Sequence, residues 1–141
     1  MPSITGISHV DLSVSDLEAS DAWYRELFGA VPLFGGRSDS NRLDARYIME
    51  PNSGVVIGLE QHDENPGTPF DERGVGLDHL AFNVASRDEL DAWLTRLDEL
   101  GIGHSGITEE EPWDVLVFRD PDNIQLEFFF LKADPSSIVP A

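Results

Sequence analysis

The strongest constraint on the fold of this 141-residue chain is an internal repeat. Residues 6–29, GISHVDLSVSDLEASDAWYRELFG, align without a gap on residues 76–99, GLDHLAFNVASRDELDAWLTRLDE, at an offset of 70. Identical positions include one histidine and one Asp-Ala-Trp triplet in each copy: Gly6/Gly76, His9/His79, Val14/Val84, Asp21/Asp91, Ala22/Ala92, Trp23/Trp93 and Leu27/Leu97. A repeat of this kind predicts two copies of one supersecondary unit.

Each copy predicts a strand followed by a helix. Residues 6–14 and 76–84 are rich in β-branched and apolar side chains, which is typical of a strand. A glycine marks the start of each segment. Ser15 and Ser86 each precede a glutamate by three residues, the capping-box spacing that marks the start of a helix. Apolar residues then recur at helical spacing in both copies, which indicates an amphipathic helix in each.

Three further strands are predicted after each helix. The segments are AVPLF, RLDARYIME and GVVIGLEQH in the first copy, and IGHSGIT, DVLVFRD and IQLEFFFLK in the second. The sequence RDPDN, residues 119–123, is typical of a tight turn. The chain is therefore predicted to be an α+β protein built from two tandem βαβββ modules.

We expect a single domain over residues 1–141, with modules at 4–62 and 75–132, a polar linker at about 61–75 and a tail at 133–141. A module of about 60 residues is small for an independent core. We therefore expect the modules to form one curved mixed sheet with the helices outside and a cleft inside. The tail is expected to be loosely held or to pair with a partner subunit.

Two histidines occupy matching positions in the repeat. His79 interrupts the apolar run of residues 76–84, where an unpaired buried polar group would cost about 1–3 kcal/mol. It is therefore either a hydrogen-bonded core histidine or a ligand. His9 lies on the same strand face of the other copy, and two converging histidines would supply half of a metal site. The remaining histidines, His62 and His104, are interpreted as exposed.

Glu127 interrupts another apolar run, IQLEFFFL. Charged side chains are rarely buried unless they are paired or bind a metal, although an outward-facing glutamate on a half-exposed strand is the alternative. Together with the duplicated histidines, Glu127 predicts a metal site formed by His9, His79 and Glu127.

The first module has no glutamate at the matching position. Aligning VVIGLEQH with NIQLEFFF places Gly58 opposite Glu127, and Glu60 lies two residues farther along on the same face. Glu60 is interpreted as a fourth ligand, a base or a charge at the cleft rim. Asp11, beside His9, is interpreted as a base, a substrate contact or a surface group. Trp113 and Phe129 are expected to contact substrate or only to cover the surface.

The amino-acid composition argues against some classes of binding partner. There are 27 acidic and 9 basic residues, and the net charge of −18 argues against binding to nucleic acid or anionic membranes. The charge suits a cationic ligand or simply a well-solvated surface.

The absence of cysteine excludes disulfides and thiolate metal sites. No apolar run reaches about 18 residues and no signal sequence is evident, so a cytoplasmic location is expected.

The segments SHVDLSVSDLEASDAWYRELFGA and RDPDNIQLEFFF, in a duplicated βαβββ pattern, resemble the vicinal oxygen chelate superfamily over residues 4–132. That group includes glyoxalase I, fosfomycin-resistance enzymes, extradiol dioxygenases and bleomycin-resistance proteins. The resemblance implies that His9, His79 and Glu127 bind one divalent ion, which would be Fe, Mn, Ni or Zn. Glyoxalase I has a glutamate at the position of Gly58, so the chain departs from that pattern.

The resemblance implies a metal-dependent lyase, isomerase or ring-cleaving dioxygenase. Its substrate would be a small molecule that chelates the metal through vicinal oxygens, with the metal acting as a Lewis acid. The alternative is a drug-sequestering protein of the bleomycin-resistance type without catalysis. We also expect a homodimer, because members of the superfamily commonly pair and because exposed sheet edges need to be covered.

Overall fold

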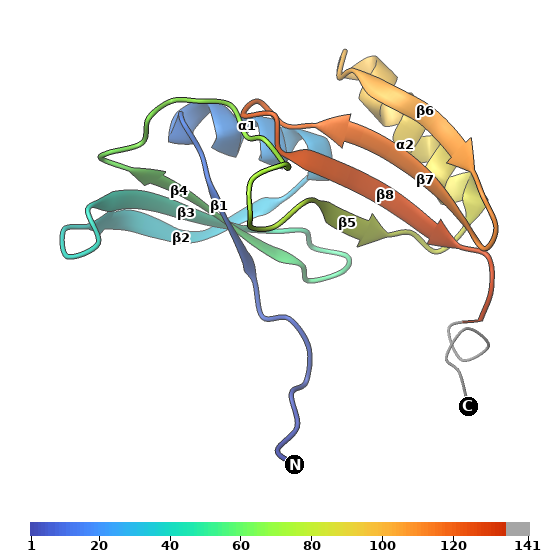
Figure 1. The fold of residues 1–141 in the computed structure, drawn as a ribbon, viewed down its shortest axis with the longest axis horizontal. Helices are drawn as coiled ribbons and strands as arrows, with labels where there is room; N and C mark the ends of the chain where they lie inside the picture. The colour runs from blue at the N-terminus through green and yellow to red at the C-terminus, as the bar shows by residue number, and fades with distance from the viewer. Residues whose placement is uncertain (135–141) are drawn as a thin grey trace. The chain divides into compact units, whose positions relative to one another are not determined.

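The computed structural model describes residues 1–134, so most of the predicted tail lies outside the described residues. The chain divides into two compact units, Met1–Thr68 and Pro69–Ala141 (Figure 1). The predicted linker at about residues 61–75 is divided between the two units. The Asn65 side chain donates a hydrogen bond to the Val14 carbonyl at 3.0 Å in unit 1, whereas the Phe70 amide donates to the Asp122 carbonyl at 2.8 Å in unit 2.

Unit 1 contains β1 (Val10–Ser13), α1 (Leu17–Phe28), β2 (Val31–Ser38), β3 (Leu43–Met49) and β4 (Val56–His62). The sheet order is β1-β4-β3-β2, with β1 parallel to β4 and the other pairs antiparallel. Helix α1 contacts β3 and β4. The core between helix and sheet includes the buried side chains Leu12, Val14, Tyr24, Leu27, Ile48, Ile57 and Leu59.

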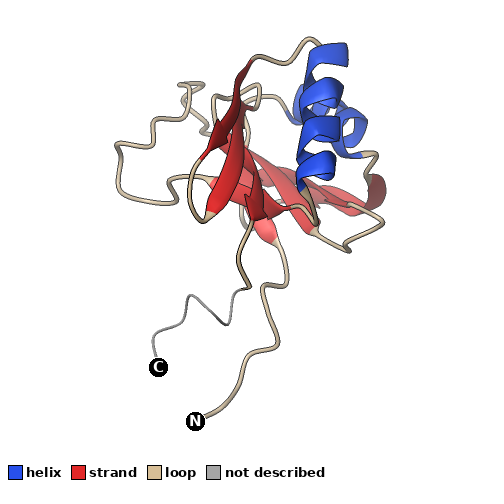
Figure 2. Cartoon of the chain, turned by 90° about the vertical axis from the view of Figure 1, so that its right-hand side faces the viewer, coloured by secondary structure: helices blue, strands red, loops and turns tan. Residues whose placement is uncertain are grey.

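Unit 2 contains β5 (Leu80–Asn83), α2 (Arg87–Glu99), β6 (His104–Glu109), β7 (Trp113–Arg119) and β8 (Gln125–Leu131). The sheet order is β5-β8-β7-β6, with β5 parallel to β8. Helix α2 contacts β6, β7 and β8, and Figure 2 distinguishes both helices from the strands. The core includes Leu90, Leu97, Leu116, Phe118, Leu126 and Phe128.

The predicted α+β fold with tandem βαβββ modules is confirmed, but the sheet is divided. The last strand of each module returns to pair with the first strand of the same module. Hydrogen bonds therefore define two four-stranded mixed sheets. We had expected one shared sheet. In the described part of the chain, no helix is both long and apolar enough to cross a membrane.

The two helices begin with different caps. Ser86 accepts a hydrogen bond from the Glu89 amide at 3.2 Å and caps α2, as predicted. The prediction for Ser15 is wrong by one residue, because Asp16 is the N-cap of α1 and its Oδ1 accepts from the Ala19 amide at 3.0 Å. A carboxylate there also interacts favourably with the helix dipole.

The strands that carry the histidines are shorter than predicted. β1 begins at Val10 and β5 at Leu80, so His9 and His79 directly precede their strands. Their side chains are 47% and 41% exposed, so the interpretation of His79 as a buried core histidine is wrong.

The other two histidines differ from one another. His62 is exposed, as predicted. The prediction for His104 is wrong, because it begins β6 and is only 16% exposed, with its Nε2 atom 3.0 Å from Asp98 Oδ1.

Candidate functional site

Glu127 lies on the face of the unit 2 sheet opposite α2. Leu126 and Phe128 are buried beneath the helix, so the side-chain alternation of a strand directs Glu127 to the other face. The Glu127 side chain is 13% exposed. Its neighbour in register on β5 is Ala81, whose small side chain leaves room for the carboxylate.

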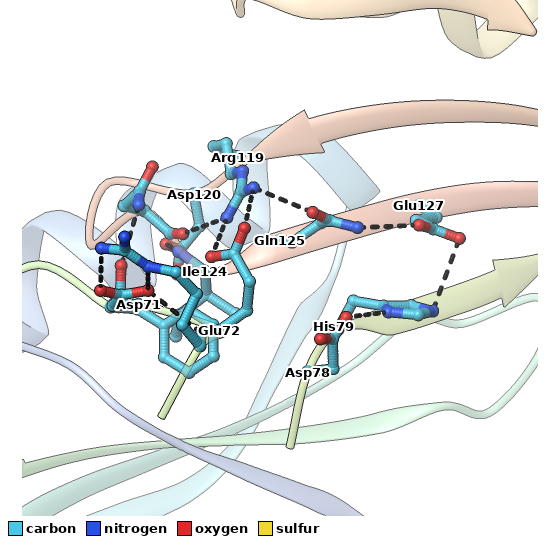
Figure 3. A network of polar contacts seen from close by, with 12 residues as sticks. Asp71, Glu72, Asp78, His79, Arg119, Asp120, Ile124, Gln125 and Glu127 are labelled. Atoms are coloured by element: carbon cyan, nitrogen blue, oxygen red, sulfur yellow. Dashed lines mark hydrogen bonds and ion pairs between the residues drawn. The ribbon is translucent and has the colours of Figure 1, made fainter. Parts of the chain in front are cut away.

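His79 approaches this carboxylate (Figure 3). Its Nε2 atom lies 3.7 Å from Glu127 Oε2, while its Nδ1 atom lies 2.7 Å from Asp78 Oδ1. The longer distance exceeds that of a hydrogen bond. Two donor atoms that each lie about 2.1 Å from one metal ion are about 3.0–4.2 Å apart, so the His79–Glu127 spacing suits two ligands of a single ion. A second carboxylate on Nδ1 is a common way to orient a metal-binding imidazole.

A chain of hydrogen bonds orients Glu127 from its other oxygen (Figure 3). Gln125 Nε2 donates to Glu127 Oε1 at 2.9 Å. Arg119 donates to Gln125 Oε1 at 2.9 Å and to the two carboxylate oxygens of Glu72 at 2.8 and 3.1 Å. Glu72, Arg119 and Gln125 were not predicted from the sequence. The available signal was that Arg119 and Gln125 are polar residues at the ends of apolar strands flanking one turn.

The Glu72–Arg119 pair predicts a specific pH dependence of stability. Hydrogen bonding by Arg119 lowers the pKa of Glu72 from 4.5 to about 2. Because the folded-state pKa is depressed, the stabilisation is complete above about pH 4.5 and is lost as the pH falls toward 2. We expect Glu72→Gln to lower the melting temperature at pH 7 by a small amount, since the pair is partly exposed, and the difference from wild type to shrink between pH 4.5 and 2. A constant difference across this range, measured by thermal melts, would contradict the assignment.

Unit 1 presents a similar pair on the face opposite α1. Leu12 and Leu59 are buried on the helix side, so the alternation directs Asp11 to the other face. His9 Nε2 lies 3.7 Å from Asp11 Oδ2, and its Nδ1 lies 3.1 Å from the Ser8 hydroxyl. Each unit therefore presents one imidazole Nε2 and one carboxylate oxygen at the same separation.

Tyr47 on β3 lies beside the unit 1 carboxylates and was not identified from the sequence. Its hydroxyl lies 3.3 Å from Asp11 Oδ2 and 3.5 Å from Glu60 Oε1, and its single proton is donated to one of them at a time. Burial, followed by the charges of Asp11 and Glu60, raises the pKa of Tyr47 above its usual value. The hydroxyl therefore remains a proton donor at neutral pH.

The other predicted site residues lie nearby in their own units. Glu60 is two residues beyond Gly58 on β4, is 22% exposed, and lies 3.9 Å from His62 Nε2. Trp113 and Phe129 are neighbours on unit 2, with ring centroids 5.9 Å apart.

The predicted metal ligands are divided between the units. The structure brings His79 and Glu127 together, whereas His9 belongs to unit 1. Within residues 1–134 no group of three or more His, Asp or Glu side chains gathers in a form that could hold a metal ion. Of the three predicted ligands, unit 2 supplies His79 and Glu127, and unit 1 supplies His9.

Comparison with known proteins identifies relatives of the whole chain. A structure of a glyoxylase/bleomycin resistance protein/dioxygenase domain from Frankia sp. EAN1pec is 38% identical, covers 92% of this chain and 93% of its own, and has a TM-score of 0.84. A trivalent organoarsenical cleaving enzyme from Bacillus sp. (strain MD1) is 28% identical over 89% of this chain and 73% of its own length. A mutant fosfomycin resistance protein FosX from Listeria monocytogenes, in complex with Mn(II) and 1S,2S-dihydroxypropylphosphonic acid, shares the fold at 20% identity and a TM-score of 0.67, covering 96% and 98% of the two chains.

The family model that matches this chain covers residues 6–128, which include His9, His79, Glu127 and every described helix. The chain belongs to the Glyoxalase/Bleomycin resistance protein/Dioxygenase superfamily.

Proposed function

We propose that this protein is a metal-dependent enzyme that binds one divalent ion through His9, His79 and Glu127. Its substrate is a small molecule that chelates the ion through two adjacent oxygens, and the reaction is a lyase, isomerase or dioxygenase reaction. Fe, Mn, Ni and Zn are the candidate metals, because two imidazoles and one carboxylate are ligands that all four accept.

The approach of His79 to Glu127 carries this proposal. Glu127 is a largely covered carboxylate on a strand whose only other polar residue is Gln125, and its Oε2 atom lies 3.7 Å from the imidazole Nε2 atom. Its other oxygen is held by Gln125, while the far side of the imidazole is held by Asp78. This separation suits two ligands that each lie about 2.1 Å from one ion.

The divalent ion supplies Lewis-acid stabilisation of negative charge on the substrate oxygens. The chain supplies orientation and proton transfer. Gln125 holds the Glu127 carboxylate through Oε1 and leaves Oε2 facing His79. The Tyr47 hydroxyl is a proton donor, and Glu60 is a candidate base that can accept a proton from substrate.

The negative charge of the protein bears on the charge of the substrate. The Asp11 and Glu60 carboxylates lie beside Tyr47 on unit 1, and the chain carries a net charge of −18. Fixed negative charge disfavours an anionic group such as the phosphonate found with FosX. We therefore propose a neutral or cationic substrate. Trp113 and Phe129 offer an aromatic surface to its apolar part.

The alternative function is sequestration of a cationic drug without catalysis. A protein that only binds a drug has no chemical need for a histidine–carboxylate pair at metal-ligand spacing. Metal uptake therefore distinguishes the two functions.

The test is a metal titration of protein purified without chelator and then stripped. Fe(II), Mn(II), Ni(II) and Zn(II) are added in turn under anaerobic conditions, and bound metal is measured by elemental analysis. We expect about one ion per chain. Failure to take up any of the four would overturn the enzyme proposal and favour the sequestering protein. A screen of vicinal diols, catechols and hydroxyketones with the loaded protein would then separate the reaction classes.

We also propose that the protein is a homodimer, because strands β1, β2, β5 and β6 lie at the edges of the two sheets and exposed edges invite pairing. Sedimentation at micromolar concentrations should give twice the 15.6-kDa mass of the chain, and the mass of a monomer would contradict this. The cytoplasmic location stays a prediction from the sequence.

A further inference from the structure

We propose that a groove in unit 1, between α1 and β2, binds a small molecule with one carboxylate and an apolar body, and that Arg25 and Arg46 hold the carboxylate. The groove has a volume of about 610 Å³ and is lined by residues of α1, β2 and β3. Small-molecule sites typically have volumes of about 300–1,000 Å³. His9, His79 and Glu127 do not line the groove, so this inference is independent of the proposed function.

The groove exists because α1 leaves β2 uncovered. Strand β2 is the outer strand of the unit 1 sheet, next to β3 (Figure 1). Helix α1 packs mainly on β3 and β4, whereas α2 also packs on β6, the strand of unit 2 that corresponds to β2. Every residue of β2 before Ser38 is therefore exposed, while β6 is partly buried at His104, Gly106 and Ile107.

The strand register shows which residues keep the groove open. Gly35 of β2 lies opposite Arg46 of β3, and the corresponding pair in unit 2 is Ile107 opposite Leu116. The two pairs correspond because Arg46 and Leu116 lie opposite equivalent residues of the last strands, Leu59 and Phe128. Unit 2 thus has two apolar side chains at these places, and Leu116 is fully buried. Unit 1 has a glycine and a charged side chain instead.

The Arg46 guanidinium bridges two carboxylates of α1 that differ in exposure. It donates to Asp21 Oδ2 at 3.1 Å and to Glu18 Oε2 at 2.6 Å. The Asp21 side chain is 10% exposed and ties Arg46 to the helix, whereas the Glu18 side chain is 84% exposed. Exposed ion pairs contribute little to stability, so a ligand carboxylate can displace Glu18 at small cost. The exchange leaves the number of carboxylates on Arg46 unchanged.

Arg25 supplies a second guanidinium on the same side of the groove. Within residues 1–134 its one polar contact runs to Asp21 Oδ2 at 3.5 Å, and Arg46 already contacts this oxygen. Its remaining donors are available to a ligand, and a guanidinium matches the two oxygens of a carboxylate. The repeat places Thr95 at the position of Arg25. The Thr95 hydroxyl donates to a carbonyl of its own helix, so neither arginine has a counterpart in unit 2.

The remaining lining limits the ligand to one negative charge and an apolar body. Leu33 and Phe34 line the groove and are both exposed apolar side chains. Asp44 also lines it, and the chain carries a net charge of −18. Fixed negative charge disfavours a dianion such as a phosphate monoester or a dicarboxylate. An aromatic or short aliphatic monocarboxylate fits both the charge and the apolar surface.

The experiment titrates benzoate into full-length protein that has been stripped of metal and desalted. Heteronuclear NMR spectra follow the backbone amides, and we expect saturable shifts centred on α1, β2 and β3. Benzamide has the same shape without the charge, and benzylammonium has the opposite charge. Each should bind at least about 10-fold more weakly than benzoate, because hydrogen bonds between two charged groups are lost.

Two variants test the arginine and the exchange with Glu18, each with a control of equal charge change. Arg25→Gln should weaken benzoate binding by about 10-fold, whereas Arg96→Gln on α2 should leave it unchanged. Glu18→Ala should strengthen binding by about 2- to 5-fold, because the competing carboxylate is removed. Glu26→Ala, on the same helix but outside the groove, should have no effect. Circular dichroism and thermal melts verify that each variant is folded.

The outcomes also separate this inference from the proposed function. A lack of saturable shifts, or shifts confined to other elements, overturns the groove as a binding site. Equal binding of benzamide, or unchanged affinity in Arg25→Gln, overturns carboxylate recognition by the arginines. An equal gain in Glu18→Ala and Glu26→Ala would show a general effect of net charge and overturn the exchange with Glu18. Failure of the wild-type protein to take up metal would overturn the proposed function and leave the groove unaffected.

Discussion

Glu127→Gln and His79→Ala are each expected to reduce metal affinity by more than about 100-fold, because each removes a ligand and not merely a partner of one. The glutamine keeps the size of Glu127 and can still accept the hydrogen bond from Gln125. It loses the negative charge that neutralises the ion. The fold should therefore be retained while metal binding is lost, and chelator competition checks this.

The matched controls are His62→Ala and Glu60→Gln. His62 is exposed at the end of β4, and its Nε2 atom lies 3.9 Å from Glu60. Both variants should keep affinity within a few-fold of wild type. Equal losses in His62→Ala and His79→Ala would mean that the wrong histidines have been assigned. An equal loss in Glu60→Gln and Glu127→Gln would make Glu60 a ligand.

The sequence predicted the order of elements because the signals for that order are local. The capping serine at Ser86 and the period-2 alternation in β7 and β8 depend on neighbouring residues only, and the repeat presents the strand–helix pattern twice. The strand ends were less predictable. Apolar residues such as Ile7 and Leu77 continue the strand pattern, but the ladder starts only where Val10 and Leu80 find a partner.

The candidate site was predictable where it follows from the repeat, and not where it depends on register between strands. Polar residues alternate poorly in RLDARYIME, so the face of Tyr47 could not be assigned from the sequence. The structure resolves this because Arg46 pairs with Glu18 and Asp21 on α1, which leaves Tyr47 on the opposite face. The proximity of Asp11 to Gly58 is likewise a cross-strand property.

Phe128→Ala is expected to cause the largest loss of stability among single substitutions in β8. Its ring is 1% exposed and lies between two aromatic rings, with centroid distances of 4.2 Å to Trp93 on α2 and 5.0 Å to Phe118 on β7. Truncating a buried phenylalanine costs about 3–5 kcal/mol, since the transfer free energy is lost and a cavity remains. That is a large fraction of the roughly 5–15 kcal/mol that stabilises a typical domain.

The adjacent Phe129→Ala is the control, because it removes the same side chain from the opposite face of the strand. Phe129 is only partly buried and contacts Trp113 at 5.9 Å between centroids. Its loss should cost less than half as much free energy of unfolding in urea denaturation followed by circular dichroism. Because Phe129 shares its face with Glu127, the variant should instead weaken binding of an apolar substrate while leaving metal affinity intact. Equal destabilisation by the two substitutions would show that both faces of β8 are core, and the Glu127 face would then be no surface for a ligand.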